Sequence, residues 1–216
     1  MTQGMQLKVV TSGTASAAVD DSLGKLISEK IASRIANKDA TVWGKDAEAE
    51  SSIRLGWVSS AKDSLSLIES IISLREKFSS RGVSRFVLCG MGGSSLAPEV
   101  ITKTYGVDLV VLDSTSPDQV SSALAEDLSR TAVIVSSKSG STVETDSQKR
   151  VFEAAFTNAG IDPRERIVIV TDPGSPMQKA AAADGYQIFE SDPTVGGRYS
   201  ALTAFGLVPS CLLYTS

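Results

Sequence analysis

The chain of 216 residues is long enough to bury a full hydrophobic core, and its 42% hydrophobic and 21% charged residues are ordinary for a globular domain. A formal net charge of −4 gives no electrostatic footprint for nucleic acid, and no apolar run approaches a membrane span, so neither partner is expected. The absence of histidine excludes a Ser-His-Asp or Cys-His triad within the chain and argues against a zinc site. Two cysteines cannot form a disulfide framework, so a cytoplasmic location is expected.

The first 81 residues carry helical periodicity. Apolar residues recur at intervals of three and four over residues 20–37, 47–57 and 62–80, and each stretch is predicted to be one helix. Residues 1–81 are therefore predicted to form an N-terminal helical segment.

Strands alternate with helices over residues 82–209. Short apolar runs bounded by glycine- or hydroxyl-rich turns predict the strands, and a helical pattern follows each of the first four. The alternation predicts an α/β domain with a doubly wound, five-stranded parallel sheet covered on both faces. The predicted strands span residues 85–89, 108–112, 131–135, 166–170 and 186–189.

A hydroxyl-rich turn follows the third predicted strand. Residues 136–142 hold five hydroxyl side chains and one lysine, and a helical pattern then begins. Such a turn directs backbone N–H groups, the positive end of the helix and several O–H donors at one place, which suits a dianionic phosphate. The alternative is an ordinary helix cap with spare serines, although a cap needs only one or two hydroxyls.

A glycine-rich turn follows the first predicted strand. Gly90 and Gly92 fit the start of a dinucleotide fingerprint, and Asp113 lies where an acidic residue would meet a ribose, but Ser95 replaces the third glycine. A nicotinamide enzyme is therefore one alternative. The turn equally suits a backbone that a small ligand approaches closely, or a tight turn with no ligand.

Three segments together resemble the ordered N-terminal signatures of the phosphoglucose isomerase family. They are residues 90–94, 137–145 and 195–200, and the resemblance covers the chain to about residue 209. Residues 41–44 and 54–57 are similar to the bacterial branch in which this enzyme is fused behind a transaldolase. The resemblance implies the sugar-isomerase (SIS) fold, a hexose 6-phosphate substrate, no cofactor, and isomerisation of glucose 6-phosphate through a cis-enediolate.

The resemblance also assigns site residues by matching position. Arg198 matches the active-site arginine, whose guanidinium would stabilise the developing oxyanion. Lys138 either assists phosphate binding or is simply a solvated lysine. The residues matched to sugar-phosphate binding are Gly93, Ser94, Ser137, Lys138, Ser139, Gly140, Ser141 and Thr142.

The departures from the family pattern concern the catalytic base and the end of the chain. The family takes its proton-abstracting glutamate, a histidine and a lysine from a second half that has no counterpart here. We expect an N-terminal fragment that binds the sugar phosphate without turnover, with residues 210–216 as a foreign or truncated tail. The full-length parent is expected to be a homodimer. A non-catalytic sugar-phosphate regulator with the same fold is a second alternative.

Overall fold

The chain divides between Ile53 and Arg54 into two compact units, and the computed structural model describes residues 8–213. The described part of the first unit consists of short helices. They are α1 (Thr14–Ser28), α2 (Ile31–Ala36), the 3-10 helix η1 (Ala40–Trp43) and α3 (Lys45–Arg54).

The single helix predicted over residues 20–37 is wrong. Lys30 has a φ of 53°, in the left-handed region, and separates α1 from α2. The amides of Glu29 and Lys30 close the end of α1 on the carbonyls of Lys25 and Ile27. The apolar spacing continues through this break, so it could not reveal where the helix ends.

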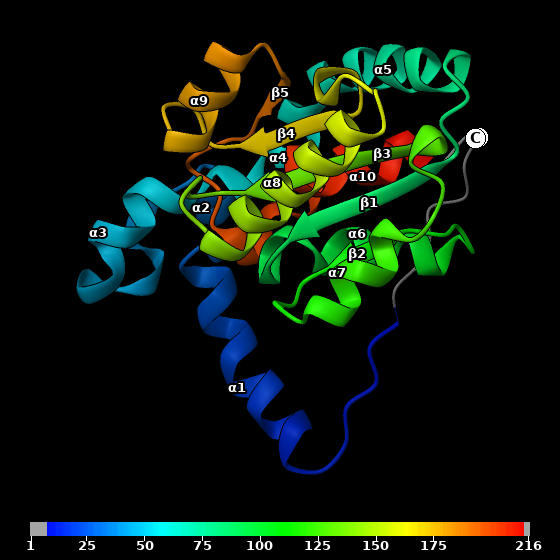
Figure 1. Ribbon diagram of the computed structural model, residues 1–216. Coiled ribbons are helices and arrows are strands. Elements are labelled where there is room, and N and C mark those ends of the chain that lie inside the picture. The colour runs from blue at the N-terminus through cyan, green and yellow to red at the C-terminus, as the bar shows by residue number, and fades with distance from the viewer. Residues whose placement is uncertain (1–7, 214–216) are drawn as a thin grey trace. The chain divides into compact units, whose positions relative to one another are not determined.

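The second unit begins with short helical turns and continues as alternating strands and helices (Figure 1). The helix predicted over residues 62–80 is three elements, and the helix predicted over 47–57 ends at Arg54. The first elements are η2 (Gly56–Val58), α4 (Ser60–Asp63), η3 (Ser64–Leu67) and α5 (Ile68–Ser80). The strands are β1 (Arg85–Gly90), β2 (Val110–Leu112), β3 (Thr131–Ser137), β4 (Ile167–Thr171) and β5 (Gln187–Glu190). The remaining helical elements are η4 (Gly92–Ser94), α6 (Leu96–Thr104), α7 (Pro117–Leu124), η5 (Leu128–Arg130), α8 (Val143–Asn158), η6 (Pro163–Glu165), α9 (Pro176–Asp184), η7 (Gly197–Leu202) and α10 (Ala204–Leu213).

The five strands form one parallel sheet in the order β2-β1-β3-β4-β5, which confirms the predicted fold class. Cys89, Val135 and Ile169 lie in register across its three central strands. The third strand is longer than predicted, because Ser136 and Ser137 still pair with neighbouring strands. Their backbone groups are bonded within the sheet, so the polar side chains do not end the strand.

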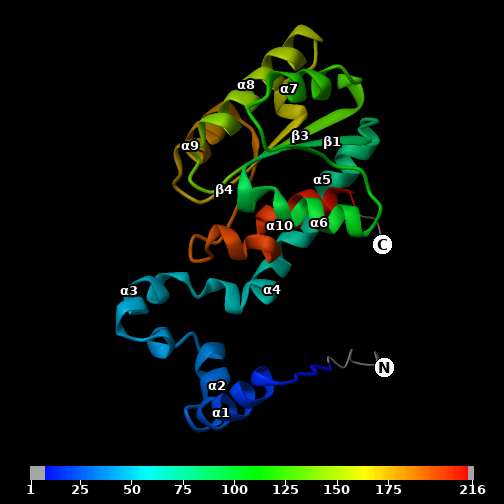
Figure 2. The ribbon, with the colours of Figure 1, turned by 90° about the horizontal axis from the view of Figure 1, so that it is seen from below.

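Helices cover both faces of the sheet (Figure 2). On one face α7, α8 and α9 pack on the strands, with Phe152 and Phe156 of α8 fully buried. On the other face α5 and α10 pack on the strands, with Phe78 and Phe205 buried. This doubly wound arrangement brings the carboxyl ends of all five strands to one edge, where such sheets bind ligands.

Helices from both ends of the second unit contribute to its core. Phe78 of α5 and Leu212 of α10 are each 2% exposed and belong to one hydrophobic cluster. Residues 210–213 therefore continue α10, whereas residues 214–216 lie outside the described part. The division into domains at residue 82 and the origin of the tail stay predictions.

Within residues 8–213, no helix has both the length and the apolarity to cross a membrane.

Candidate functional site

The turn between β3 and α8 is folded by its own hydroxyl groups. The amide of Gly140 donates to Ser137 Oγ at 3.2 Å, and the amide and hydroxyl of Ser141 donate to Ser139 Oγ at 3.2 and 3.0 Å. Gly140 has a φ of 66°, and a Cβ there would lie 2.7 Å from Ser175 Oγ. This position therefore favours glycine both for its backbone angle and for its lack of a side chain.

Thr142 occupies the N-cap position of α8 but does not cap it. Its side chain makes no bond to the first amides of the helix, and its Oγ1 lies instead 2.9 Å from Ser137 Oγ. The first N–H groups of a helix have no partner within the helix. The capping alternative therefore does not account for Thr142, and α8 begins with donors that no side chain satisfies.

The turn between β1 and α6 lies directly against η7. A Cβ on Gly93 would stand 2.5 Å from the carbonyl oxygen of Gly197, a distance that no real side chain tolerates. Ser200 Oγ lies 2.7 Å from the Gly197 carbonyl and 3.4 Å from that of Gly93, and donates to both. The contact brings together two of the glycine-containing segments singled out in the sequence.

A cavity of about 460 Å³ lies where these turns meet. All three segments that resemble the family signatures contribute to its wall. The lining residues are Arg54, Met91, Gly93, Ser94, Lys138, Ser139, Thr142, Asp172, Gly197, Ser200 and Phe205.

Lys138 is held in an ion pair on this wall. Its Nζ lies 2.6 Å from Asp172 Oδ2, and the two side chains are only 23% and 18% exposed. Burial raises the pKa of Asp172, while the hydrogen bond and the positive charge of Lys138 oppose the rise. Lys138 is therefore a fixed cation beside the cavity, with an internal partner.

The structure brings some predicted site residues to the cavity and leaves others away from its wall. Gly93, Ser94, Lys138, Ser139 and Thr142 line it. Ser137, Gly140 and Ser141 do not line it; they fold the turn behind its wall. Arg198 is exposed and does not line it, although the adjacent Gly197 does.

Six lining residues were not among the predicted site residues, and two of them, Arg54 and Asp172, are charged. Asp172 directly follows β4, and its position at a strand end next to β3 was a usable signal. Arg54 precedes the sheet by many residues, and no local pattern places it at the cavity.

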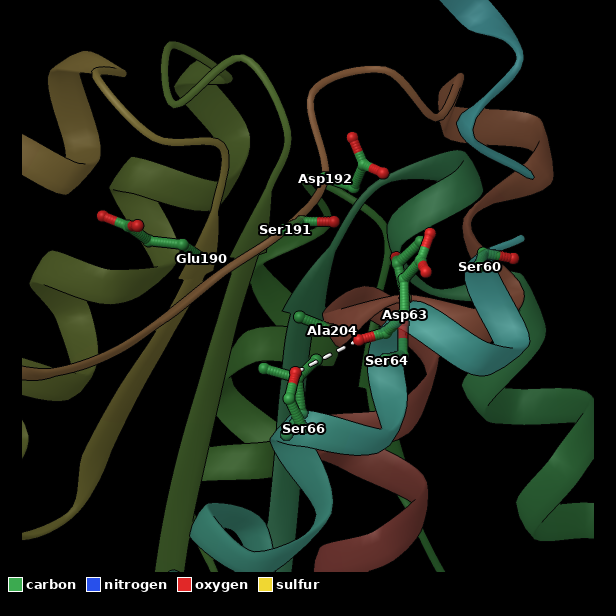
Figure 3. A pocket seen from close by; sticks show the side chains of 10 residues that line it. Ser60, Asp63, Ser64, Ser66, Glu190, Ser191, Asp192 and Ala204 are labelled. Carbon is green, nitrogen blue, oxygen red and sulfur yellow. Dashed lines mark hydrogen bonds between the residues drawn. The ribbon is translucent and has the colours of Figure 1, made fainter. Parts of the chain in front are cut away.

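A neighbouring, smaller hollow of about 210 Å³ has the opposite character (Figure 3). It lies beyond the end of β5, and the acidic residues Asp63, Glu190 and Asp192 line it, although the carboxyl group of Glu190 points away from the other two (Figure 3). Like charges repel, so this hollow disfavours a phosphate, whereas the larger cavity carries Arg54 and Lys138.

Among residues 8–213, no three His, Cys, Asp or Glu side chains are grouped to hold a metal ion.

The fold and the strand-end cavity define a doubly wound α/β protein with a polar cavity at the carboxyl ends of its strands. The family model described as phosphoglucose isomerase matches residues 26–214, and the chain belongs to this family.

Known proteins resemble this chain over most of its length. A glucose-6-phosphate isomerase from Thermus thermophilus is 35% identical over 161 residues, which are 72% of this chain and 38% of that protein. The crystal structure of a hypothetical protein from Thermus thermophilus superposes with a TM-score of 0.72 at 30% identity, over 91% of this chain and 46% of the other. The crystal structure of a glucose-6-phosphate isomerase from Chlamydia trachomatis superposes with a TM-score of 0.63 at 28% identity, over 83% of this chain and 34% of the other. The chain thus spans less than half the length of each of these relatives.

We predict that Gly93→Ala destabilises the protein. The added Cβ forces the β1–α6 turn away from Gly197, and overpacking of this kind costs about 1–3 kcal/mol. Thermal unfolding followed by circular dichroism measures the loss. Gly197→Ala is the matched control, because no atom lies within 4 Å of its added Cβ. Equal melting temperatures for the two variants would contradict the close approach.

A second prediction concerns the carboxyl group of Asp172. In a pH titration followed by carbon NMR, Asp172 should titrate above its ordinary pKa of 3.8, because burial disfavours the charged form. Lys138→Met should move the midpoint higher still, since it removes the ammonium that lowers this pKa. Lys179→Met, at an exposed position on α9, is the control. An unchanged midpoint in Lys138→Met would refute the ion pair.

Proposed function

We propose that this chain is the phosphate-binding part of a glucose-6-phosphate isomerase and binds a hexose 6-phosphate in the cavity described above. The observation that carries the proposal is the convergence of the β1–α6 turn, the β3–α8 turn and η7 on one cavity with two cations. Membership of the phosphoglucose isomerase family and the likeness to named glucose-6-phosphate isomerases support the choice of substrate.

Some O–H groups of the β3–α8 turn remain available to donate a hydrogen bond to a ligand. Ser139 Oγ accepts two bonds from Ser141, so its own O–H proton remains available. Ser137 Oγ accepts from Gly140, and its proton can go to Thr142 Oγ1, which leaves the Thr142 O–H for a ligand. Together with the first amides of α8, these groups form a cradle for a phosphoryl group.

The chemical step needs groups beyond this cradle. Arg198 is the group that we assign to the oxyanion of the enediolate, from its match to the family arginine. Among the described residues, Asp172 is the one carboxylate on the cavity wall, and Lys138 already engages it. We infer that the base for proton transfer between C1 and C2 is supplied from outside residues 8–213. A homodimer, a fusion to transaldolase and a cytoplasmic location belong to the same proposal.

The cradle predicts that Ser139→Ala and Thr142→Ala each weaken the binding of glucose 6-phosphate about tenfold, because each removes one charge-assisted hydrogen bond. Isothermal titration calorimetry on the 216-residue chain measures this. Ser122→Ala, an exposed hydroxyl on α7, is the control and should bind normally. Full affinity in both cradle variants would remove the assignment.

We also predict that the chain alone binds glucose 6-phosphate without converting it to fructose 6-phosphate, because the described residues offer no free base at the cavity. An assay coupled to fructose 6-phosphate consumption tests this, with calorimetry on the same sample as the control for binding. Turnover at a rate typical of an enzyme, several per second, would contradict the inference about the base.

A further inference from the structure

The smaller hollow beyond β5, of about 210 Å³, has a wall rich in oxygen atoms. Eight of its ten lining residues carry a hydroxyl or carboxyl group, and none is a lysine or an arginine. They come from three places in the second unit: α4 with η3, the end of β5 with the two residues after it, and the junction of η7 and α10. The wall therefore offers negative charge and no positive charge.

Two acidic residues of this wall, Asp63 and Asp192, have no cationic partner. Asp63 Oδ2 accepts from Ser59 Oγ at 2.5 Å, and Asp192 Oδ1 accepts from the amide and hydroxyl of Thr194 at 2.8 and 2.6 Å. Within residues 8–213 neither carboxyl group forms an ion pair, because Lys138 meets Asp192 at its backbone carbonyl and pairs with another residue. Neutral donors hold the two groups in place, and their negative charges remain uncompensated by the chain.

Ser191 adds a polar group without a partner. Its side chain is 5% exposed, and its Oγ makes no hydrogen bond within the described residues. Its amide donates to the carbonyl of Thr171 at 3.0 Å, which fixes the backbone, and its hydroxyl points toward Asp63 and away from Glu190 (Figure 3). Buried hydroxyl groups in folded proteins are nearly always hydrogen-bonded, so an unpaired one on the wall of a hollow points to a ligand there.

The charge and the size of the hollow narrow the choice of ligand. Its carboxylates repel an anion, and a neutral polyol would leave their charges uncompensated. Among residues 8–213, no three acidic side chains are grouped to hold a metal ion. A volume of about 210 Å³ lies below the range of about 300–1,000 Å³ that is usual for drug-sized ligands, so only a small molecule fits. A protonated primary amine combines one positive charge with three N–H donors, like the head group of lysine.

We propose that the smaller hollow is a binding site for a small primary amine in its protonated form. The ammonium group donates to the carboxylates of Asp63 and Asp192 and to Ser191 Oγ. Hydrogen bonds between a charged donor and a carboxylate are among the strong ones, so three contacts suffice for a small ligand. The site uses no residue that lines the larger cavity, and the proposal is therefore independent of the function proposed above.

The test uses ethanolamine as the probe and follows the amide NMR spectrum of the 216-residue chain at neutral pH. Ethanolamine is protonated there and should shift the amide signals of Ser191 and Asp192 in a saturable way, with an affinity that falls as salt is added. Ethylene glycol replaces the ammonium group by a hydroxyl and should not bind. Tetramethylammonium keeps the charge without N–H donors and should bind about tenfold more weakly than ethanolamine.

Three variants test the residues of the site. Asp63→Asn should raise the dissociation constant for ethanolamine about tenfold, because it removes one of the two charges. Ser191→Ala should raise it about threefold and leave the melting temperature unchanged, because the lost hydroxyl has no partner in the free chain. Glu190→Gln is the matched control: it removes a charge from the same wall, but the carboxyl group of Glu190 points away, so the affinity should stay the same.

The outcomes that overturn the proposal are distinct. They are no saturable shift with ethanolamine, equal affinity for ethylene glycol, binding of magnesium or potassium chloride as tight as that of ethanolamine, and an effect of Glu190→Gln as large as that of Asp63→Asn. Should Asp63→Asn not fold, as melting curves would show, Ser191→Ala decides. Unchanged affinity for ethanolamine in Ser191→Ala refutes the site, and weaker binding at an unchanged melting temperature supports it.

Discussion

The contact between the backbones of Gly93 and Gly197 is the constraint on which the cavity depends. With no room for a Cβ at Gly93, the β1–α6 turn and η7 pack backbone to backbone. This approach links a segment at the start of the sheet to one beyond its last strand. Because β3 and β4 follow β1 in the parallel sheet, the β3–α8 turn and Asp172 lie beside this contact. The parallel sheet brings the strand ends to one edge, and the contact between Gly93 and Gly197 forms one side of the cavity there.

Charge decides which hollow at this edge suits an anion. The smaller hollow beyond β5 is lined by Asp63 and Asp192 together with Glu190, whose carboxyl group points away, and the larger cavity has two cations and one carboxylate among its lining residues. One hydrogen bond joins a residue that lines the smaller hollow to one that lines the larger cavity: Lys138 Nζ donates to the carbonyl of Asp192 at 3.4 Å. The Lys138 ammonium therefore donates to the Asp172 carboxylate and to the Asp192 carbonyl, and these two bonds hold it between the two hollows.

Much of the second unit could be predicted from its sequence, because continuous apolar runs such as Val133–Val135 have few structures open to them other than buried strands. The ends of the helices were harder to predict from the sequence. The break between α1 and α2 depends on the left-handed backbone of Lys30, and the spacing of apolar residues does not indicate it. The turns of the site were found because glycine and hydroxyl residues stand out locally. Arg54 was missed because it reaches the cavity only through the bridge between Leu55 and Val195, a contact between segments that are distant in the sequence.

The internal ion pair also limits what Lys138 can add to ligand binding. A phosphoryl group that takes the ammonium must replace a bond of 2.6 Å to Asp172, so the gain is only the difference between two ion pairs. Removing the lysine from Asp172 would further leave a half-buried carboxylate, one of whose oxygens already has no partner within the described residues. The first amides of α8 have no such competitor, because no side chain caps them. In the proposed complex, groups without internal partners would therefore supply most of the free energy of binding, and the lysine would chiefly compensate the charge of Asp172.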